Sequence, residues 1–302
     1  MDLVQAGRFT EEEAREYLEK IRWPDGPKCP HCSGMNVTRL AGEKARPGTI
    51  QCNSCREQFT VTVGTVMEDS HLPLHKWVLA FHLMASSKKG VSALQLKRQL
   101  GIGSYQTAWH LCHRIRHAMK KHPDAPMLQG VVEADETYVG GRARGKRSAG
   151  RSLKNKTPVV ALVERGGNIK VKPVARVTKK NLRKALQEGI DTSATVMTDD
   201  FASYRGLEKV FAGHKIIKHS EGVYSQGGVN TNTVESFFSL LKRGVYGSFH
   251  HVSKRHLHRY CDEFGFRWDH RKIEDAERTE AAIQGAEGKR LMYAKPHNLK
   301  AS

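Results

Sequence analysis

Residues 130–139 read Gly-Val-Val-Glu-Ala-Asp-Glu-Thr-Tyr-Val, a strand-like stretch with Asp135 near its middle. Two further strand-like runs follow, at 158–163 and 169–177, joined by the hairpin turn Gly166-Gly167-Asn168. The chain then continues with a helix from Thr178, a strand at 194–198, a short helical stretch, a strand at 215–218 and a helix at 232–241. This order predicts an α/β protein: a ribonuclease H-like mixed sheet with flanking helices.

Three acidic residues stand at points that this fold would bring together. Asp135 lies inside an apolar strand, Asp199 follows the strand at 194–198, and Glu235 lies on the helix at 232–241. Each alone is more commonly a surface carboxylate, but the combination indicates a shared site. Converging like charges raise one another's pKa unless cations compensate, and Mg²⁺ accepts such oxygen ligands. Two such ions can hold the attacking and leaving oxygens of a phosphodiester.

The helix at 232–241 offers two candidates for the third ligand. Asn232 and Glu235 are three residues apart and so share a helix face, and either side chain could reach the metal ions. Lys242 lies two turns beyond Glu235, where its ammonium could meet a DNA phosphate, and Arg243 extends the same cationic end. A helix C-terminus with basic residues that favour its dipole is the simpler interpretation of these two cations.

Four of the six cysteines form two C-x2-C pairs, Cys29 with Cys32 and Cys52 with Cys55. Nineteen residues separate the pairs, enough for a short hairpin that brings the two turns together. Four thiolates in a tetrahedron suit a structural Zn²⁺, so the spacing predicts a zinc ribbon. A pair of disulfides or a redox-active pair is the weaker alternative, because the chain shows no secretion signal and no redox fold.

Residues 71–122 have the pattern of two helices around a tight turn. Ser92 caps a helix that ends at Gly101, and a second helix covers 105–121. This plan is typical of a helix-turn-helix, whose second helix enters the major groove of DNA. Side chains suited to phosphates and base edges are expected on the outward face of that helix: Gln106, His110, His113, Arg114, Arg116, His117, Lys120 and Lys121. A plain helical hairpin with a solvated basic face is the alternative.

The charge balance favours a polyanionic partner. The 302 residues include 50 Lys or Arg against 31 Asp or Glu, a net charge of +19, which indicates nucleic acid more simply than an acidic protein. The segment 142–156 carries seven cations and no acid, and it leaves the strand of Asp135. It could follow the DNA backbone, and it includes Arg142, Arg144, Lys146 and Arg147. A basic loop without DNA contact is the alternative.

No apolar stretch approaches the roughly 18 residues of a membrane span, and the N-terminus lacks the plan of a secretion signal. We therefore expect a cytoplasmic protein, associated with the bacterial nucleoid, and no membrane partner.

Several segments resemble the zinc-ribbon transposases of bacterial insertion sequences of the ISXO type. The run 133–141 resembles their first-aspartate segment, 196–199 their second-aspartate strand, and 230–244 their third segment; 253–271 is similar to a downstream helix of the group. With the ribbon, the resemblance covers most of residues 28–272. One departure is the run Arg267-Trp268-Asp269-His270-Arg271, where the group's pattern would have an Asn before the last Arg, and it concerns packing or DNA contact.

The resemblance implies a DDE-type transposase that uses Mg²⁺ or Mn²⁺ to cleave DNA at the ends of its element and joins the 3′-hydroxyls to target DNA. Carried over to this sequence, Asp135 and Asp199 are the first two metal ligands. Glu235 is favoured over Asn232 as the third, because its spacing to Lys242 fits the pattern of the group. The implied partner is double-stranded DNA, both terminal repeats and target, and cutting two ends implies at least a dimer in the reaction complex.

Two other functions remain open from the sequence: a DNA-binding regulator with an inactive ribonuclease H-like domain, and a structure-selective nuclease or resolvase. The expected organisation is an N-terminal helix, a zinc ribbon, a helix-turn-helix-like DNA-binding segment, a catalytic domain and a polar tail, at 1–25, 26–68, 71–122, 128–273 and 274–302.

Overall fold

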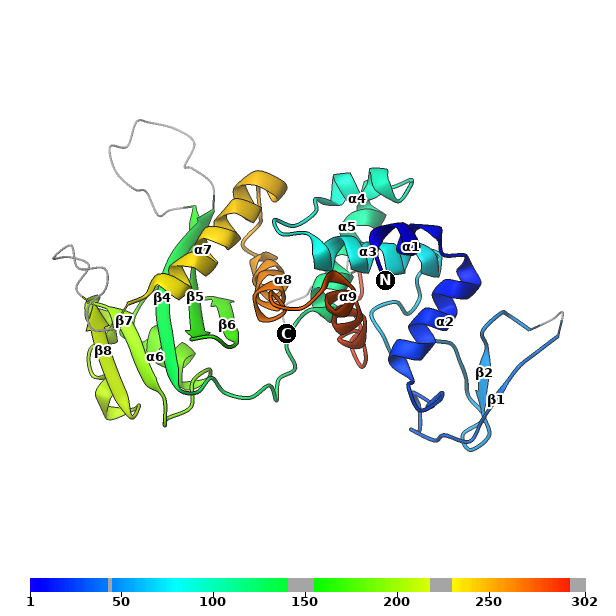
Figure 1. Cartoon of the computed structure of the whole chain (residues 1–302), viewed down its shortest axis with the longest axis horizontal. Helices are drawn as coiled ribbons and strands as arrows, with labels where there is room; N and C mark the ends of the chain where they lie inside the picture. The colour runs from blue at the N-terminus through cyan, green and yellow to red at the C-terminus, as the bar shows by residue number, and fades with distance from the viewer. Residues whose placement is uncertain (43–44, 141–154, 218–229, 294–302) are drawn as a thin grey trace, which may run out of the picture. The chain divides into compact units, whose positions relative to one another are not determined.

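The computed structural model describes residues 1–42, 45–140, 155–217 and 230–293, which form two compact units (Figure 1). The first unit contains Met1–Lys120 together with the C-terminal segment from Ile273, and the second contains Lys121–Lys272.

The first unit combines a small antiparallel sheet with helices. Its sheet has the order β1-β2-β3, formed by β1 (Val37–Arg39), β2 (Ile50–Cys52) and β3 (Gln58–Phe59). Its helices before the second unit are α1 (Leu3–Arg8), α2 (Glu11–Arg22), α3 (Leu74–Ser86), α4 (Ala93–Gln99) and α5 (Tyr105–Ala118). A capping box between Thr10 and Glu13 begins α2, since each side chain accepts a hydrogen bond from the other residue's backbone N–H.

The C-terminal segment differs from the polar tail expected at 274–302. Residues Asp275–Gln284 form helix α9, which packs against α3 and α2. Its inward face is buried at Thr279, Ala282 and Ile283, and the Thr279 hydroxyl lies 3.0 Å from Nδ1 of His82 on α3. At least this part of the tail therefore belongs to the core of the first unit.

The second unit is built on a five-stranded mixed sheet with the order β6-β5-β4-β7-β8 (Figure 1). Its strands are β4 (Val131–Gly140), β5 (Lys156–Glu164), β6 (Ile169–Pro173), β7 (Thr195–Asp199) and β8 (Gly213–Ile217). β4, β5 and β6 pair antiparallel, whereas β7 pairs parallel to β4 and β8 parallel to β7. The α/β class and the ribonuclease H-like mixed sheet predicted from the sequence are confirmed.

Helices cover both faces of this sheet. Helix α6 (Lys179–Gln187) packs on one face through a core that includes Val132, Ala134, Val160, Leu162, Leu182 and Leu186. Helices α7 (Asn232–Gly244) and α8 (Leu257–Asp269) pack on the other through a core that includes Val159, Ala161, Val163, Phe237, Leu241 and Phe264. Because side chains alternate along a strand, the odd-numbered residues of β4 face α7 and α8.

Candidate catalytic and zinc-binding sites

The register of β4 and β7 places the two predicted aspartates at the same level. The strands run parallel, and their last paired positions are Glu133 and Met197. Asp135 and Asp199 each lie two residues further along, so both side chains leave the same face of the sheet, Asp135 from the middle of β4 and Asp199 from the C-terminal end of β7. Asp199 also accepts a hydrogen bond from the backbone N–H of Phe201, at 3.1 Å.

Asp135 is half-buried in a strongly acidic environment. Burial is the largest cause that raises the pKa of its carboxyl, to about 7, and the neighbouring carboxylates of Glu136, Asp199 and Glu235 raise it further. The backbone N–H of Glu136, 2.7 Å from Oδ1, acts in the opposite direction. Asp135, Asp199 and Glu235 therefore interact electrostatically, although they lie 64 and 36 residues apart along the chain.

Glu235 lies near the start of α7, where Thr231 orients it. The buried Thr231 hydroxyl donates to Oε1 of Glu235, at 3.1 Å. Both Glu235 and Asn232 are exposed, so both side chains have room to turn. Among the described residues, no three acidic or histidine side chains place their ligand atoms within 4.8 Å of one another. Asp135, Asp199 and Glu235 therefore do not all meet within that distance.

Glu136 is a further acid at this position that the sequence pattern did not single out. It follows Asp135 and so points to the α6 face, where the hydroxyl of the buried Tyr204 donates to Oε2, at 2.6 Å. Burial is the main cause that raises the pKa of Glu136, and Asp199 adds to the effect. A signal was present in the sequence, since Glu136 is one of three acids within a single strand.

Glu133 is the other acid that the sequence pattern did not single out. It is fully buried on β4, on the same face as Asp135. Its carboxylate accepts hydrogen bonds from Arg165 and from the first turn of α7.

Lys242 and Arg243 lie in the last turn of α7, as predicted from the sequence. Lys242 is half-buried and Arg243 is exposed, with its Nε donating to the carbonyl of Ser239, at 3.1 Å. Seven residues are about two helical turns, so Lys242 lies on the same side of α7 as Glu235.

Part of the expected DNA-reading face of α5 is directed elsewhere. Arg114 is buried: it donates to the carbonyl of Glu68 and its guanidinium lies 5.6 Å from the ring centre of Trp77. The expectation that Arg114 faces outward was wrong, because this cation has partners from the loop before α3 and from α3 itself.

Gln106 and His110, nearer the start of α5, contact the C-terminal segment. Gln106 donates to the hydroxyl of Tyr293, at 2.5 Å, and the His110 ring packs edge-on against the Tyr293 ring. Gln106 is still exposed. The predicted DNA contacts Arg142, Arg144, Lys146 and Arg147 lie outside the described residues.

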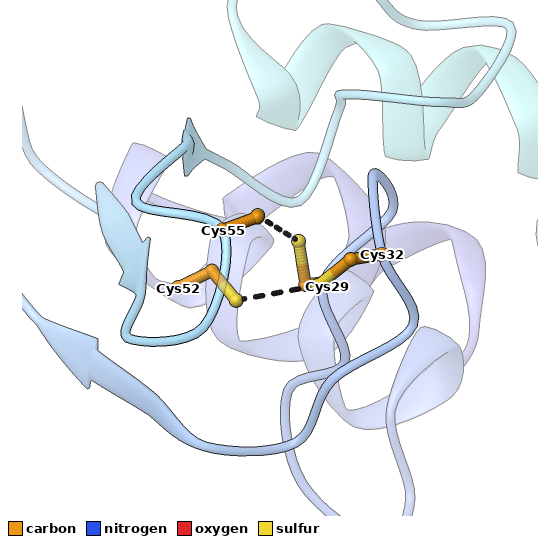
Figure 2. A group of neighbouring side chains, drawn as sticks. All are labelled: Cys29, Cys32, Cys52 and Cys55. Atoms are coloured by element: carbon orange, nitrogen blue, oxygen red, sulfur yellow. Dashed lines mark hydrogen bonds between the residues drawn. The ribbon is translucent and has the colours of Figure 1, made fainter.

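The four paired cysteines form one cluster at the tips of two turns. Their sulfur atoms lie within 4.8 Å of one another, with Sγ–Sγ distances of 3.7 Å between Cys29 and Cys55 and 3.5 Å between Cys32 and Cys52. Figure 2 shows the side chains turned toward one another from the two turns. Four sulfur donors at this spacing fit a tetrahedral Zn²⁺.

The two cysteine turns share one backbone geometry. Ser33 and Arg56, each directly after the second cysteine of a pair, have φ of 62° and 66°. In each turn the backbone N–H of this residue donates to the carbonyl of the first cysteine, at 2.9 and 3.0 Å. Backbone N–H groups of Cys55 and Ser54 also lower the pKa of the Cys52 thiol to about 6, which favours the metal-binding thiolate.

Comparison with known proteins matches two segments of the chain to family domains. Residues 127–269 match the ISXO2-like transposase domain, and residues 9–58 match the transposase zinc-ribbon domain. An uncharacterised protein in the transposable element ISH50 of Halobacterium salinarum is 33% identical over 275 residues, which cover 85% of this chain and 90% of the relative. The chain belongs to the ISXO2-like transposase family.

Membership of the ISXO2-like family confirms the resemblance found in the sequence and the zinc ribbon before the transposase domain. Among solved structures, a pre-cleavage Mos1 transpososome aligns with 66% of this chain and 75% of that chain, at 15% identity and a TM-score of 0.24. Within the described parts of this ISXO2-like protein, no helix is both long and apolar enough to cross a membrane.

Proposed function

We propose that this chain binds the ends of its insertion sequence, cleaves DNA phosphodiesters there with divalent metal ions, and joins the freed 3′-hydroxyl ends to target DNA. One observation carries the proposal: Asp135 and Asp199 lie level on neighbouring parallel strands, and Glu235 of α7 interacts electrostatically with Asp135. Family membership supports the same reaction class.

The chemistry of the gathered side chains fits Mg²⁺ or Mn²⁺. Carboxylate oxygens are the ligands these ions prefer, and the proposed ligands are Asp135, Asp199 and Glu235. Like charges repel one another, so a spread arrangement is expected for these acids before cations bind. When bound, a pair of divalent ions lowers the pKa of the attacking group and stabilises the charge that develops at the phosphorus.

The protein's own part in the reaction is to hold and orient. In the first step, a water oxygen attacks the phosphorus at the element's end and the bond to the 3′ oxygen breaks, which leaves a 3′-hydroxyl on the element. In the second step, this hydroxyl attacks a target phosphodiester and displaces the target's 3′ oxygen. Neither step needs a covalent protein intermediate, so the protein's part would be limited to the carboxylates that hold the metal ions and to Lys242, which would bind the substrate phosphates.

Glu235 is proposed as the third ligand, with Asn232 beside it. Its carboxylate interacts with Asp135 and is oriented by the Thr231 hydroxyl.

The zinc ribbon would hold one structural Zn²⁺ through its four cysteines. Gln106, on an exposed part of α5, and Arg243, exposed on α7, are proposed DNA contacts, and His110 is proposed with Gln106 because both lie on the first turns of α5. A reaction that cuts two ends requires at least a dimer.

Cleavage of the element's own ends tests the proposal. Purified, zinc-loaded chain is incubated with Mg²⁺ or Mn²⁺ and labelled duplexes that carry the terminal repeats, with a plasmid as target. We expect cleaved ends and joined products, and Asp199→Ala should reduce both by at least about a thousandfold. Asp124→Ala is the matched control, since Asp124 is an exposed aspartate of the same unit outside the site.

The products distinguish this proposal from its alternatives. Cleavage without joined product would indicate a nuclease or resolvase. Binding of the repeats without any metal-dependent cleavage would indicate a regulator. Either result, with an otherwise intact protein, would contradict the proposed function.

A further inference from the structure

The buried carboxylate of Glu133 is connected to two other parts of the fold. Its side chain is 0% exposed. Oε1 accepts hydrogen bonds from Arg165 Nε and Thr233 Oγ1, both at 2.8 Å. Oε2 accepts from the backbone N–H groups of Thr233 and Val234, at 2.8 and 3.1 Å. All four donors therefore converge on one carboxylate.

The backbone contacts make Glu133 the cap of α7. The first N–H groups of a helix have no partner within it, and a side chain at the N-cap usually satisfies them. The N-cap residue of α7, Thr231, makes no such hydrogen bond with its side chain. Glu133 supplies the acceptor from β4 instead, and its negative charge is favoured at the positive end of the helix dipole.

Arg165 completes the arrangement from the end of β5. Besides its bond to Glu133, its Nη2 donates to the carbonyl of Asn230, at 3.1 Å, in the segment that leads into α7. Its backbone N–H donates to the carbonyl of Val131, at 3.0 Å, so the arginine is itself fixed to β4. The start of α7 is thus held to β4 directly by its hydrogen bonds to Glu133. It is also held indirectly by Arg165, which binds both Glu133 and the carbonyl of Asn230.

The positions of these contacts relate them to the proposed metal ligands. Glu133 precedes Asp135 by two residues on the same face of β4, and Glu235 directly follows Val234, whose N–H is bound. Asp135 and Glu235 are therefore connected by a short segment of β4, the Glu133 carboxylate and the first turn of α7.

We propose that Glu133 is a positioning residue of the transposase site: it holds the first turn of α7 against β4 and so sets the distance between Asp135 and Glu235. The inference rests on the proposed function. It assigns Glu133 no contact with DNA or with metal ions, because its oxygens are buried and occupied by four donors. Groups that orient metal ligands from outside typically change metal affinity by 10- to 100-fold.

Metal affinity measured without DNA tests this role. Mn²⁺ binding to the zinc-loaded chain is followed by electron paramagnetic resonance, with Asp135→Ala defining the signal of the site. Glu133→Gln keeps the size of the side chain but replaces one acceptor oxygen by an amide that faces donors. We expect it to weaken Mn²⁺ binding at the site by about tenfold.

Two further variants separate positioning from general stability. Asp269→Asn is the matched control: Asp269 is a buried carboxylate at the end of α8 that accepts from the backbone of Ile169 and from Lys121, neither of which belongs to α7. It should lower the melting temperature without changing Mn²⁺ affinity. Thr233→Val removes one donor to Glu133 and should weaken Mn²⁺ binding by about threefold, which provides a test if Glu133→Gln does not fold.

The outcomes are distinct. Weaker Mn²⁺ binding in Glu133→Gln or Thr233→Val, with Asp269→Asn unchanged, supports the role. If Glu133→Gln folds and binds Mn²⁺ as tightly as the unsubstituted chain, the positioning role is wrong while the proposed function stands. If Glu133→Gln does not fold, the same result for folded Thr233→Val leads to the same conclusion. If the unsubstituted chain and Asp135→Ala bind Mn²⁺ equally, the chain has no metal site at Asp135. The proposed function is then wrong, and so is the positioning role of Glu133.

Discussion

The ionised form of Asp135 lowers the free energy of unfolding because of the surroundings of its carboxyl. Burial and three neighbouring acids raise the pKa of its carboxyl from 3.8 to about 7. The folded chain thus holds this proton more tightly than the unfolded chain does. The contribution of this carboxyl to the free energy of unfolding is therefore fully present below about pH 4 and is lost as the pH rises through about 7.

Substitution by a neutral isostere should therefore stabilise the protein at alkaline pH. Without added Mg²⁺ or Mn²⁺, we expect Asp135→Asn to raise the free energy of unfolding by about 1–3 kcal/mol at pH 8 and to leave it nearly unchanged at pH 4. Denaturant unfolding of the zinc-loaded chain at both pH values measures this. A pH-independent difference, or a less stable Asn variant at pH 8, would contradict the assigned environment of Asp135.

Glu235 and Asn232 differ in their relation to Asp135. The Glu235 carboxylate is among the charges that raise the pKa of Asp135. We therefore expect Glu235→Ala to reduce end cleavage by at least about a thousandfold, and Asn232→Ala by about tenfold or less. Single-turnover cleavage rates of the two variants give the comparison, and the reverse order of severity would assign the third ligand to Asn232.

Single residues of the site were predictable to different degrees. Asp135 and Asp199 could be found because an acid within or directly after an apolar strand is unusual in the sequence itself. Glu133 is in the same strand, but its role depends on Thr233 and Val234, which lie about 100 residues away along the chain. No local pattern shows which of three acids in one strand a distant helix will use as its cap.

We expect the zinc ribbon to depend on bound metal, because its three strands are two or three residues long. Such a sheet buries little apolar surface, and structural Zn²⁺ contributes roughly 10 kcal/mol or more to the folding of small domains. We expect Cys52→Ser to release zinc and unfold the ribbon, as measured by metal analysis and circular dichroism.

The other cysteines provide the control for the ribbon. Cys112, on α5, is buried and lies outside the cluster, so Cys112→Ala should retain one zinc ion per chain. Stoichiometric zinc in the Cys52→Ser protein would show that the four-sulfur site is not the one that holds the metal.

Secondary structure was more predictable than the directions in which helices face. The turn between α4 and α5 follows from Gly101 and Gly103, and the pattern of the second helix predicts one buried and one outward face. Arg114 lies among the cations of the expected outward face, yet it packs on Trp77 and binds Glu68. An arginine can bury its stem and pair its head inside a protein, so charge alone does not determine its side.

The net charge of +19 belongs to the protein as a whole, and a large share of it lies in one segment. Seven of the cations occur within residues 142–156. If these cations bind phosphates, replacing all seven by Gln should weaken binding of the terminal repeats. It should also flatten the dependence of log K on log salt by about 0.9 for each phosphate that the variant no longer neutralises.

Titration of labelled duplex at several salt concentrations measures both quantities. Neutral substitutions within this segment leave Asp135 and Asp199 in place, so folding can be verified by unchanged Mn²⁺ binding. An affinity and a salt slope equal to those of the unsubstituted chain would remove the segment from the DNA interface.

The division of the chain into units could be predicted only in part. The change from helical to strand patterns near residue 128 marks the beginning of the sheet. The return of the chain after Lys272 to the first unit could not be predicted, because the segment looks polar and its apolar face is small. Ala282 and Ile283 are buried on α9, which packs against α3, α2 and α5, and Arg22 forms an ion pair with Glu287.

The proposed function requires Asp135, Asp199 and Glu235 to share divalent metal ions. Crystals of the full chain bound to a duplex of its terminal repeat, grown with Mn²⁺, test this most directly through the anomalous signal of manganese. We expect manganese peaks coordinated by oxygens of all three side chains, beside the phosphate at the element's end. Manganese held by other residues at that phosphate, with Asp135 and Asp199 apart from it, would show that these carboxylates are not the metal ligands.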